Sequence, residues 1–135
     1  MMKVSDVRSF LLSKLPELSG QMVYNGAINR NDEKSIGIFI APESRSQNTM
    51  CVGGAEATVL AMLPINILVR WTSDYEGCME EANRIYKLFQ WSQNIEMGST
   101  KVSVIQLLDG NPVDLGRDDK NICECTIRVN IHYYL

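Results

Sequence analysis

The chain of 135 residues contains a single histidine, His132, and this residue decides which kinds of nucleophilic catalysis are open to it. A serine or cysteine nucleophile of the triad type needs an imidazole beside it to accept its proton. His132 occupies a polar position in a closing segment whose residues alternate between apolar and polar. We therefore expect His132 to be structural or solvated, and the sequence predicts no catalytic residue and no enzyme activity.

The cysteines are the next candidates for chemistry, either as metal ligands or as thiols of low polarity. Only Cys123 and Cys125 are close in sequence, and their spacing on a strand directs both sulfurs to one face. No second pair and no histidine cluster completes a zinc site. The pattern indicates buried thiols that act as small hydrophobic side chains, so we expect no metal and no cofactor. The remaining cysteines are Cys51 and Cys78.

Two further patterns raise the question of a bound ion. Gly53-Gly54 is a glycine pair without a following lysine, which gives little support to a phosphate-binding loop. Asp114, Asp118 and Asp119 form a group of carboxylates, but the ligand spacing of an EF-hand is absent. We interpret these carboxylates as part of a solvated turn beside opposite charges.

Composition narrows the classes of partner. The chain is 45% hydrophobic and 21% charged, with a formal net charge of −3 and a pI of about 5.1. Proteins that bind nucleic acids or anionic membranes in general rely on clustered Lys and Arg, which this chain lacks. Charges interrupt the apolar run near the N-terminus, unlike the core of a signal peptide. We therefore expect a single domain over residues 1–135 that is made in the cytoplasm, with no membrane partner.

Apolar periodicity predicts two helices. Residues 4–15 repeat apolar side chains at helical spacing, with Ser5 or Asp6 as the cap and Pro16 as the stop. The second helix is predicted over residues 74–92. Ser73 and, three residues later, Glu76 match a capping box at its start. The stripe expected to face the core consists of Tyr75, Cys78, Met79, Ala82, Ile85, Tyr86 and Phe89, and the residues expected off it are Glu76, Glu80, Glu81, Arg84 and Lys87.

Alternation and turn residues predict the strands. Ile36, Ile38 and Ile40 share one face of their strand, and Pro64 is expected to end the apolar run 58–63, whose structure the sequence leaves open. Gly116 is expected in a turn. The order of elements predicts an α+β fold: a mostly antiparallel or mixed β-sheet with two main helices packed on one face. The predicted strands are residues 21–24, 35–41, 65–71, 102–108, 112–115 and 122–135.

The polar stretch at 42–54 predicts an exposed loop. Loops of this length are uncommon in compact domains and are often functional. An ordinary hairpin tip remains an equal alternative.

Several stretches, taken in order, carry a family resemblance: Gly53-Gly54, the strand 64–71 (PINILVRW), the helix 75–89 with its apolar core, the stretch 112–118 (PVDLGRD), and the final NIHYY at 130–134. This arrangement resembles the tail terminator and minor capsid proteins of long-tailed bacteriophages, a head–tail joining group with members in phage tail-like bacteriocins. The resemblance extends from about residue 4 to the end of the chain.

The resemblance implies a structural virion protein. Such a subunit would form a homohexameric ring that caps the tail tube, stops its polymerisation and offers a docking surface to the head connector. Its partners would be further copies of itself, the tail tube protein, the sheath of a contractile tail, and a head-completion protein. DNA would only pass through the pore, and the location would be the tail–head junction of a virion assembled in the bacterial cytoplasm.

The resemblance also suggests where subunits or the tube would meet, because paired charges at an interface fix register more than affinity. The alternatives that stay open are another head- or tail-completion ring protein, a small α+β ligand-binding domain or enzyme, and a nucleic-acid-binding sheet. The residues expected at the interface are Glu43, Arg45, Asn48, Arg70, Asp114, Arg117, Asp118, Asp119 and Lys120.

Overall fold

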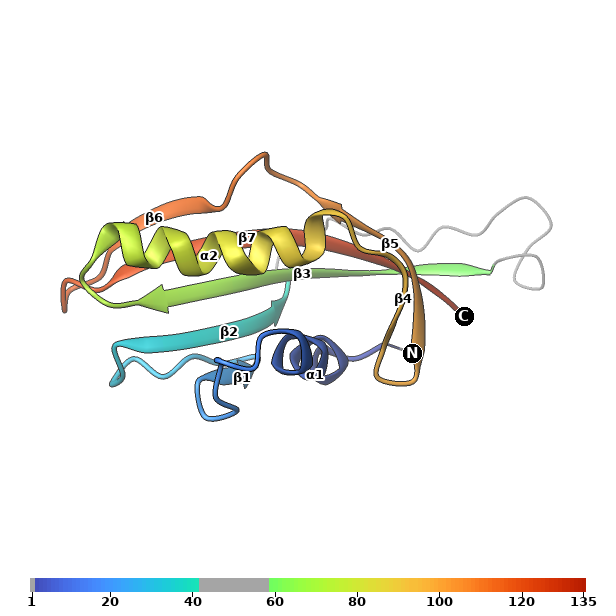
Figure 1. The fold of residues 1–135 in the computed structure, drawn as a ribbon, viewed down its shortest axis with the longest axis horizontal. Coiled ribbons are helices and arrows are strands. Elements are labelled where there is room, and N and C mark those ends of the chain that lie inside the picture. The colour runs from blue at the N-terminus through green and yellow to red at the C-terminus, as the bar shows by residue number, and fades with distance from the viewer. Residues whose placement is uncertain (1, 42–58) are drawn as a thin grey trace.

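The computed structural model describes residues 2–41 and 59–135, and the exposed loop expected at 42–54 lies outside them. The described residues form two helices and seven strands (Figure 1). The helices are α1 (Val4–Lys14) and α2 (Tyr75–Gln90). The strands are β1 (Val23–Asn25), β2 (Lys34–Ile40), β3 (Leu60–Trp71), β4 (Gln93–Met97), β5 (Thr100–Leu107), β6 (Val113–Arg117) and β7 (Cys123–Tyr134).

All seven strands belong to one sheet with the order β1-β2-β3-β7-β5-β4. The β1–β2 pair is parallel and the other pairs are antiparallel, so the sheet is mixed. β5 and β6 pair with different parts of the same edge of β7, at Val129–Tyr133 and at Cys123–Thr126. The expected α+β fold with a mostly antiparallel sheet is confirmed.

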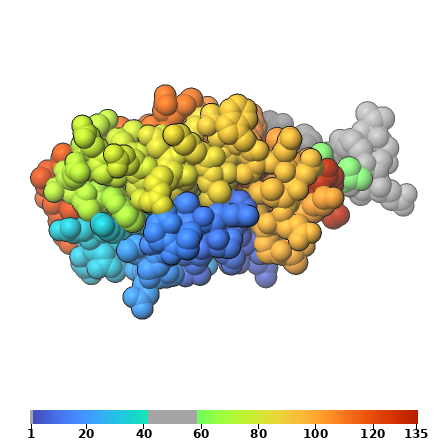
Figure 2. Space-filling view, in the orientation of Figure 1, coloured from blue at the N-terminus to red at the C-terminus, as the bar shows by residue number. Residues whose placement is uncertain are grey.

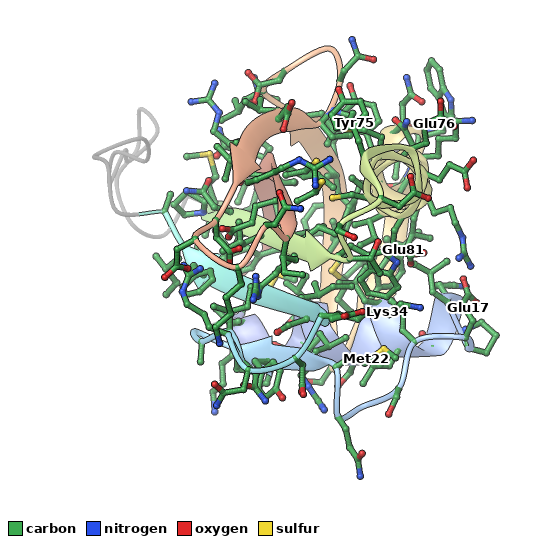
Figure 3. All side chains as sticks on the ribbon, turned by 90° about the vertical axis from the view of Figure 1, so that its left-hand side faces the viewer. Glu17, Met22, Lys34, Tyr75, Glu76 and Glu81 are labelled. Atoms are coloured by element: carbon green, nitrogen blue, oxygen red, sulfur yellow. The ribbon has the colours of Figure 1, made fainter. Side chains whose placement is uncertain are left out.

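Both helices pack on one face of the sheet, as the end-on view shows (Figure 3). They lie side by side on the surface of that face (Figure 2), and the rings of Phe10 and Phe89 meet with centroids 6.0 Å apart. Alternate residues of the central strands point under them, among them Ile67 of β3 and Ile131 of β7, which are fully buried. The helices and the helix-facing side of the sheet therefore share one hydrophobic core.

β7 is long because it is the strand on which most of the sheet is assembled. Leu60 to Arg70 of β3 pair with it along one edge, while β5 and β6 occupy the other. The alternation expected for this strand is confirmed. The residues of its buried face are Cys123, Cys125, Ile127, Val129, Ile131 and Tyr133.

The expectation that Pro64 interrupts the apolar run before it is wrong, since β3 begins at Leu60 and runs through Pro64 to Trp71. The Pro64 carbonyl points toward β2 and accepts a hydrogen bond from the Ala41 N–H at 3.0 Å. In an antiparallel sheet the N–H and C=O of one residue point to the same neighbouring strand. The N–H that Pro64 lacks would therefore also have pointed toward β2. β2 ends at Ile40, so the missing donor interrupts no strand ladder.

Two features near the sheet edges differ from the expectations. β4 was not predicted, because Gln93, Asn94 and Glu96 are exposed and only Ile95 and Met97 carry an apolar signal. Gly116 lies within β6 and not in a turn. The pairing of β6 with β7 shifts register between Asp114 and Gly116, and Gly116 has a φ of 86°, which marks a β-bulge.

The start of α2 also differs. Asp74 is its N-cap residue, and the Ser73 capping box is not formed; the Ser73 carbonyl instead accepts a hydrogen bond from Arg117. Tyr75 was expected in the core but is 47% exposed. Side chains on a helix lean toward its N-terminus. Because Tyr75 is the first residue of α2, its side chain leans past the end of the helix and stays exposed. Similarly, Asp6 of α1 is not the cap but accepts the Lys3 N–H at 2.9 Å.

The burial of two residues is the reverse of what the sequence predicts. Ile40, the last residue of β2, is 59% exposed although Ile36 and Ile38 on the same strand are fully buried. Glu81, expected on the solvated side of α2, is buried. Glu81 precedes Ile85 by one helical turn, so it lies at the border of the apolar stripe, where neighbouring elements cover it.

Replacing Phe89 by alanine tests the shared core. Phe89 is fully buried between the helices and the sheet, so Phe89→Ala should lower the free energy of unfolding by about 3–5 kcal/mol. Trp91 is 84% exposed, so Trp91→Ala is a matched control that should change it by less than about 0.5 kcal/mol. Urea unfolding monitored by circular dichroism measures both. Equal losses would contradict this description of the core.

Candidate interaction surface

Arg70 lies on the face of the sheet opposite the helices, yet its side chain is only 1% exposed. Its Nη1 donates to Asp118 Oδ2 at 2.5 Å, and its Nη2 donates to the Arg30 carbonyl at 3.0 Å. The segment between β1 and β2 covers this part of the sheet. A Cβ added to Gly37 would lie 2.3 Å from the Ala27 carbonyl oxygen, so the backbone approach there requires glycine.

Asp118 organises the turn between β6 and β7. Its Oδ1 accepts the backbone N–H groups of Ile122 and Lys120, both at 2.9 Å. The Ile122 N–H, the Lys120 N–H and the Arg70 guanidinium together hold the pKa of the Asp118 carboxyl below its ordinary value. The Asp118 contribution to stability is therefore present at neutral pH and is lost as the pH falls through that lowered pKa.

The other charges of this turn lie at the surface. Lys120 Nζ donates to the Arg30 carbonyl at 3.0 Å, and Arg117 donates to the Ser73 and Asn121 carbonyls. Asp119 is exposed. The structure therefore brings Arg70, Asp118 and Lys120 together, and Arg70 and Asp118 pair directly with each other within the chain. A partner would meet the exposed charges rather than the Arg70–Asp118 pair.

The remaining candidate residues do not join this group. Asp114 Oδ1 accepts the Gly116 N–H at 2.8 Å and stabilises the bulge of β6. Glu43, Arg45 and Asn48 lie outside the described residues.

The helix-free face also carries a shallow apolar hollow of about 290 Å³ across β2, β3 and β7. Asn66 Oδ1 is buried there and has no hydrogen-bond partner among the described residues. Buried polar groups are normally paired, so this acceptor is an unusual polar atom in an otherwise apolar hollow. The lining residues are Phe39, Ile40, Asn66, Leu68 and Thr126.

The paired ends of β3 and β7 form a second apolar feature, which we call the projecting end (Val59, Leu60, Tyr134 and Leu135). Leu60 pairs with Tyr134, and the Leu135 N–H donates to the Val59 carbonyl at 2.9 Å. These strands extend beyond the helices at the right of Figure 2. All four residues are exposed, from 40% for Tyr134 to 73% for Leu135. Clustered exposed apolar side chains are typical of contact surfaces.

On the helix side, Glu81 is a carboxylate at the border of the core. Its Oε2 accepts a hydrogen bond from Arg84 at 3.0 Å, and its Oε1 is buried without a partner among the described residues. Figure 3 shows Glu81 beside Lys34 of β2 and Glu17, and Arg84 forms a further ion pair with Glu17. Burial raises the pKa of the Glu81 carboxyl, and the positive charge of Lys34 opposes this only in part.

Within residues 2–41 and 59–135 the structure brings no catalytic constellation together. His132 is half-buried, and no cluster of three or more His, Cys, Asp or Glu residues in the described part could hold a metal ion. No helix among the described residues is long and apolar enough to span a membrane. The candidate contact surface in the described part of the chain consists of the apolar hollow, the projecting end and the charged turn between β6 and β7.

Sequence analysis missed the parts of this surface that depend on chain folding. Asn66 belongs to an alternating strand, where a polar residue is expected to face water, and nothing in the pattern marks its Oδ1 atom as buried. Ile40 also belongs to an alternating strand, and nothing in the sequence pattern marks this apolar residue as exposed. Leu60 and Tyr134 lie in apolar segments, so only their pairing at the end of the sheet identifies the projecting end.

Comparisons with known proteins add no relative. No family model matches the chain, no curated protein matches its sequence, and no solved structure matches it.

Replacing Arg70 by methionine tests whether the buried pair positions the charged turn. Arg70→Met should lower the melting temperature by roughly 10 °C, because it leaves the Arg30 carbonyl and Asp118 without their buried donor. Arg30 offers the matched control, since its side chain is 57% exposed and lies 3.5 Å from Glu124. Arg30→Met should lower the melting temperature by no more than a few degrees. Similar losses for both variants would show that Arg70 is not structural.

Replacing Glu81 by glutamine tests the buried carboxyl. Because its pKa is raised in the folded state above the ordinary value of 4.5, the wild type should lose stability relative to Glu81→Gln as the pH rises above 4.5. The difference should become constant once the pH exceeds the raised pKa. Urea unfolding between pH 4 and pH 8 measures it, with the exposed Glu80→Gln as control. A pH-independent difference would show that Glu81 titrates normally.

Proposed function

We propose that this protein is a ring-forming structural subunit, the tail terminator of a long-tailed phage or phage tail-like particle. The ring would cap the tail tube, stop its polymerisation and present a surface to the head connector. The family resemblance of the strand, helix and C-terminal stretches supports this proposal. The α+β fold that the resemblance implied agrees with the observed fold.

The observation that carries the proposal is the presence of two different apolar surfaces on one chain. The hollow lies on the helix-free face, and the projecting end lies where β3 and β7 extend beyond the helices. A contact between unlike surfaces of identical subunits is heterologous, and heterologous contacts close into rings when the rotation between subunits allows it. A subunit with two such surfaces has what a ring requires.

Electrostatics supports the passage of DNA through such a ring without tight binding. The net charge is −3, and Arg70 and Arg117, which flank the charged turn, are hydrogen-bonded within the chain. Affinity for DNA rises with the number of phosphates that Lys and Arg neutralise. A pore lined by such a surface would let DNA slide.

The test separates ring formation from tube capping. The mass of the purified protein, measured by light scattering over a concentration series, should approach that of six copies, and negative-stain images should show rings. Leu60→Asp should raise the protein concentration needed for assembly at least tenfold, because it places a charge in the projecting end. Trp91→Asp is the control, since Trp91 is also apolar and is more exposed than Leu60 (84% against 43%) but lies at the end of α2.

The second arm uses tail tubes polymerised from the tube protein. Added wild-type protein should bind one end of each tube and limit its length, and Leu60→Asp should do so less well. Rings that leave tube length unchanged would favour another completion protein of the particle. A protein that stays monomeric and does not affect tubes would refute the proposal.

A further inference from the structure

Two buried thiols from distant parts of the sequence lie in contact beneath α2. The sulfur of Cys78 on α2 lies 3.6 Å from the sulfur of Cys125 on β7. The two residues are 0% and 1% exposed, and both are free thiols. A disulfide bond has a sulfur–sulfur distance of about 2.05 Å, so the pair would need to close by about 1.5 Å. Side-chain rotation with a small shift of the helix covers such a distance.

The third described cysteine does not share this contact. Cys123 lies on the same face of β7 as Cys125, but its sulfur faces the Ser73 carbonyl at 3.8 Å. Residues two apart on a strand are separated by about 6.6 Å, so Cys78 can lie directly over only one of them. The other close neighbour is a thioether, with Met79 Sδ 3.3 Å from Cys125 Sγ. The geometry therefore selects one pair of thiols.

The contact also distinguishes the two sulfurs chemically. Cys78 and Cys125 share a hydrogen bond in which either sulfur could be the donor, and this contact lowers the pKa of Cys125 below its ordinary value although burial opposes the shift. The same hydrogen bond and burial raise the pKa of Cys78. Thiolates are the reactive form of cysteine, so Cys125 is the sulfur that would react first with an oxidant.

We propose that Cys78 and Cys125 are a redox-active dithiol that closes to an intrachain disulfide and joins α2 covalently to β7. With hydrogen peroxide as the oxidant, the Cys125 thiolate attacks one peroxide oxygen and becomes a sulfenic acid, and the released hydroxide takes up a proton to become water. Cys78 then loses its proton and attacks the Cys125 sulfur, and the sulfenic hydroxyl leaves with that proton as a second water. Two thiols and one peroxide thus give one disulfide and two waters.

The disulfide would stabilise the fold, because it closes a loop of 47 residues between α2 and the central strand. Restricting the unfolded chain by a loop of this size should raise the melting temperature by about 5–15 °C. This chemistry does not depend on the ring proposal. If the protein is a particle subunit, the thiols would be reduced during cytoplasmic assembly and would oxidise after release from the cell.

The experiment maps the bond directly in the full-length protein. Purified reduced protein is treated with hydrogen peroxide, its remaining thiols are alkylated in denaturant, and it is digested with trypsin and a glutamate-specific protease. Glu124 separates Cys123 from Cys125, so the two give different peptides. The expected product is a disulfide between the peptides 77–80 and 125–128, with a protein mass lower by two hydrogen atoms.

Matched variants complete the test. Cys123→Ala removes an equally buried thiol of the same strand and should keep both the mass loss and the rise in melting temperature. Cys125→Ala should abolish both. The wild-type peptide map is decisive even if a variant folds poorly. Disulfides through Cys51 or Cys123, or oxidation that adds oxygen to methionine while Cys78 and Cys125 stay fully alkylated, would overturn the proposal.

Discussion

The antiparallel pairing of β3 with β7 is the constraint on which the rest of the structure depends. Leu60 to Arg70 pair with Tyr134 to Glu124, and this ladder forms the centre of the sheet. Every second residue of both strands points under the helices, so a slip by one residue would expose the whole apolar set. The same pairing places Leu60 beside Tyr134 at the projecting end and Asn66 in the floor of the hollow, so it also creates the candidate contact surface.

The helix-free face owes its form to polar interactions rather than to a second hydrophobic layer. Arg70 reaches the Arg30 carbonyl and Asp118, which secures the segment after β1 and the turn before β7 against one end of the sheet. The hollow lies on the same face but lacks such a partner for Asn66 Oδ1. One end of this face is thus covered by other segments of the chain, and another part is an apolar hollow with a buried acceptor that has no partner among the described residues. The hollow is one of the two apolar surfaces on which the ring proposal rests.

The helix side contains a carboxyl and a pair of thiols that respond to solution conditions. Glu81 is a buried carboxyl whose charged form the fold disfavours, and Cys78 and Cys125 are thiols in contact across the interface between α2 and β7. Both features lie where α2 packs on the sheet. A rise of pH or a change of redox potential would therefore act on that packing, whereas a fall of pH would act on Asp118 in the turn between β6 and β7.

The sequence by itself determined the fold class, both helices, the buried face of β7 and the burial of the described cysteines, because apolar periodicity within one segment reports which face meets the core. The sequence also identified Arg70 and Asp118 as candidate interface residues. Only the tertiary structure decided that these two residues pair with each other, that β3 continues through Pro64, that Glu81 is covered, and that Cys78 meets Cys125. Each of these depends on which residues of distant segments become neighbours, and a local pattern carries no information about that choice.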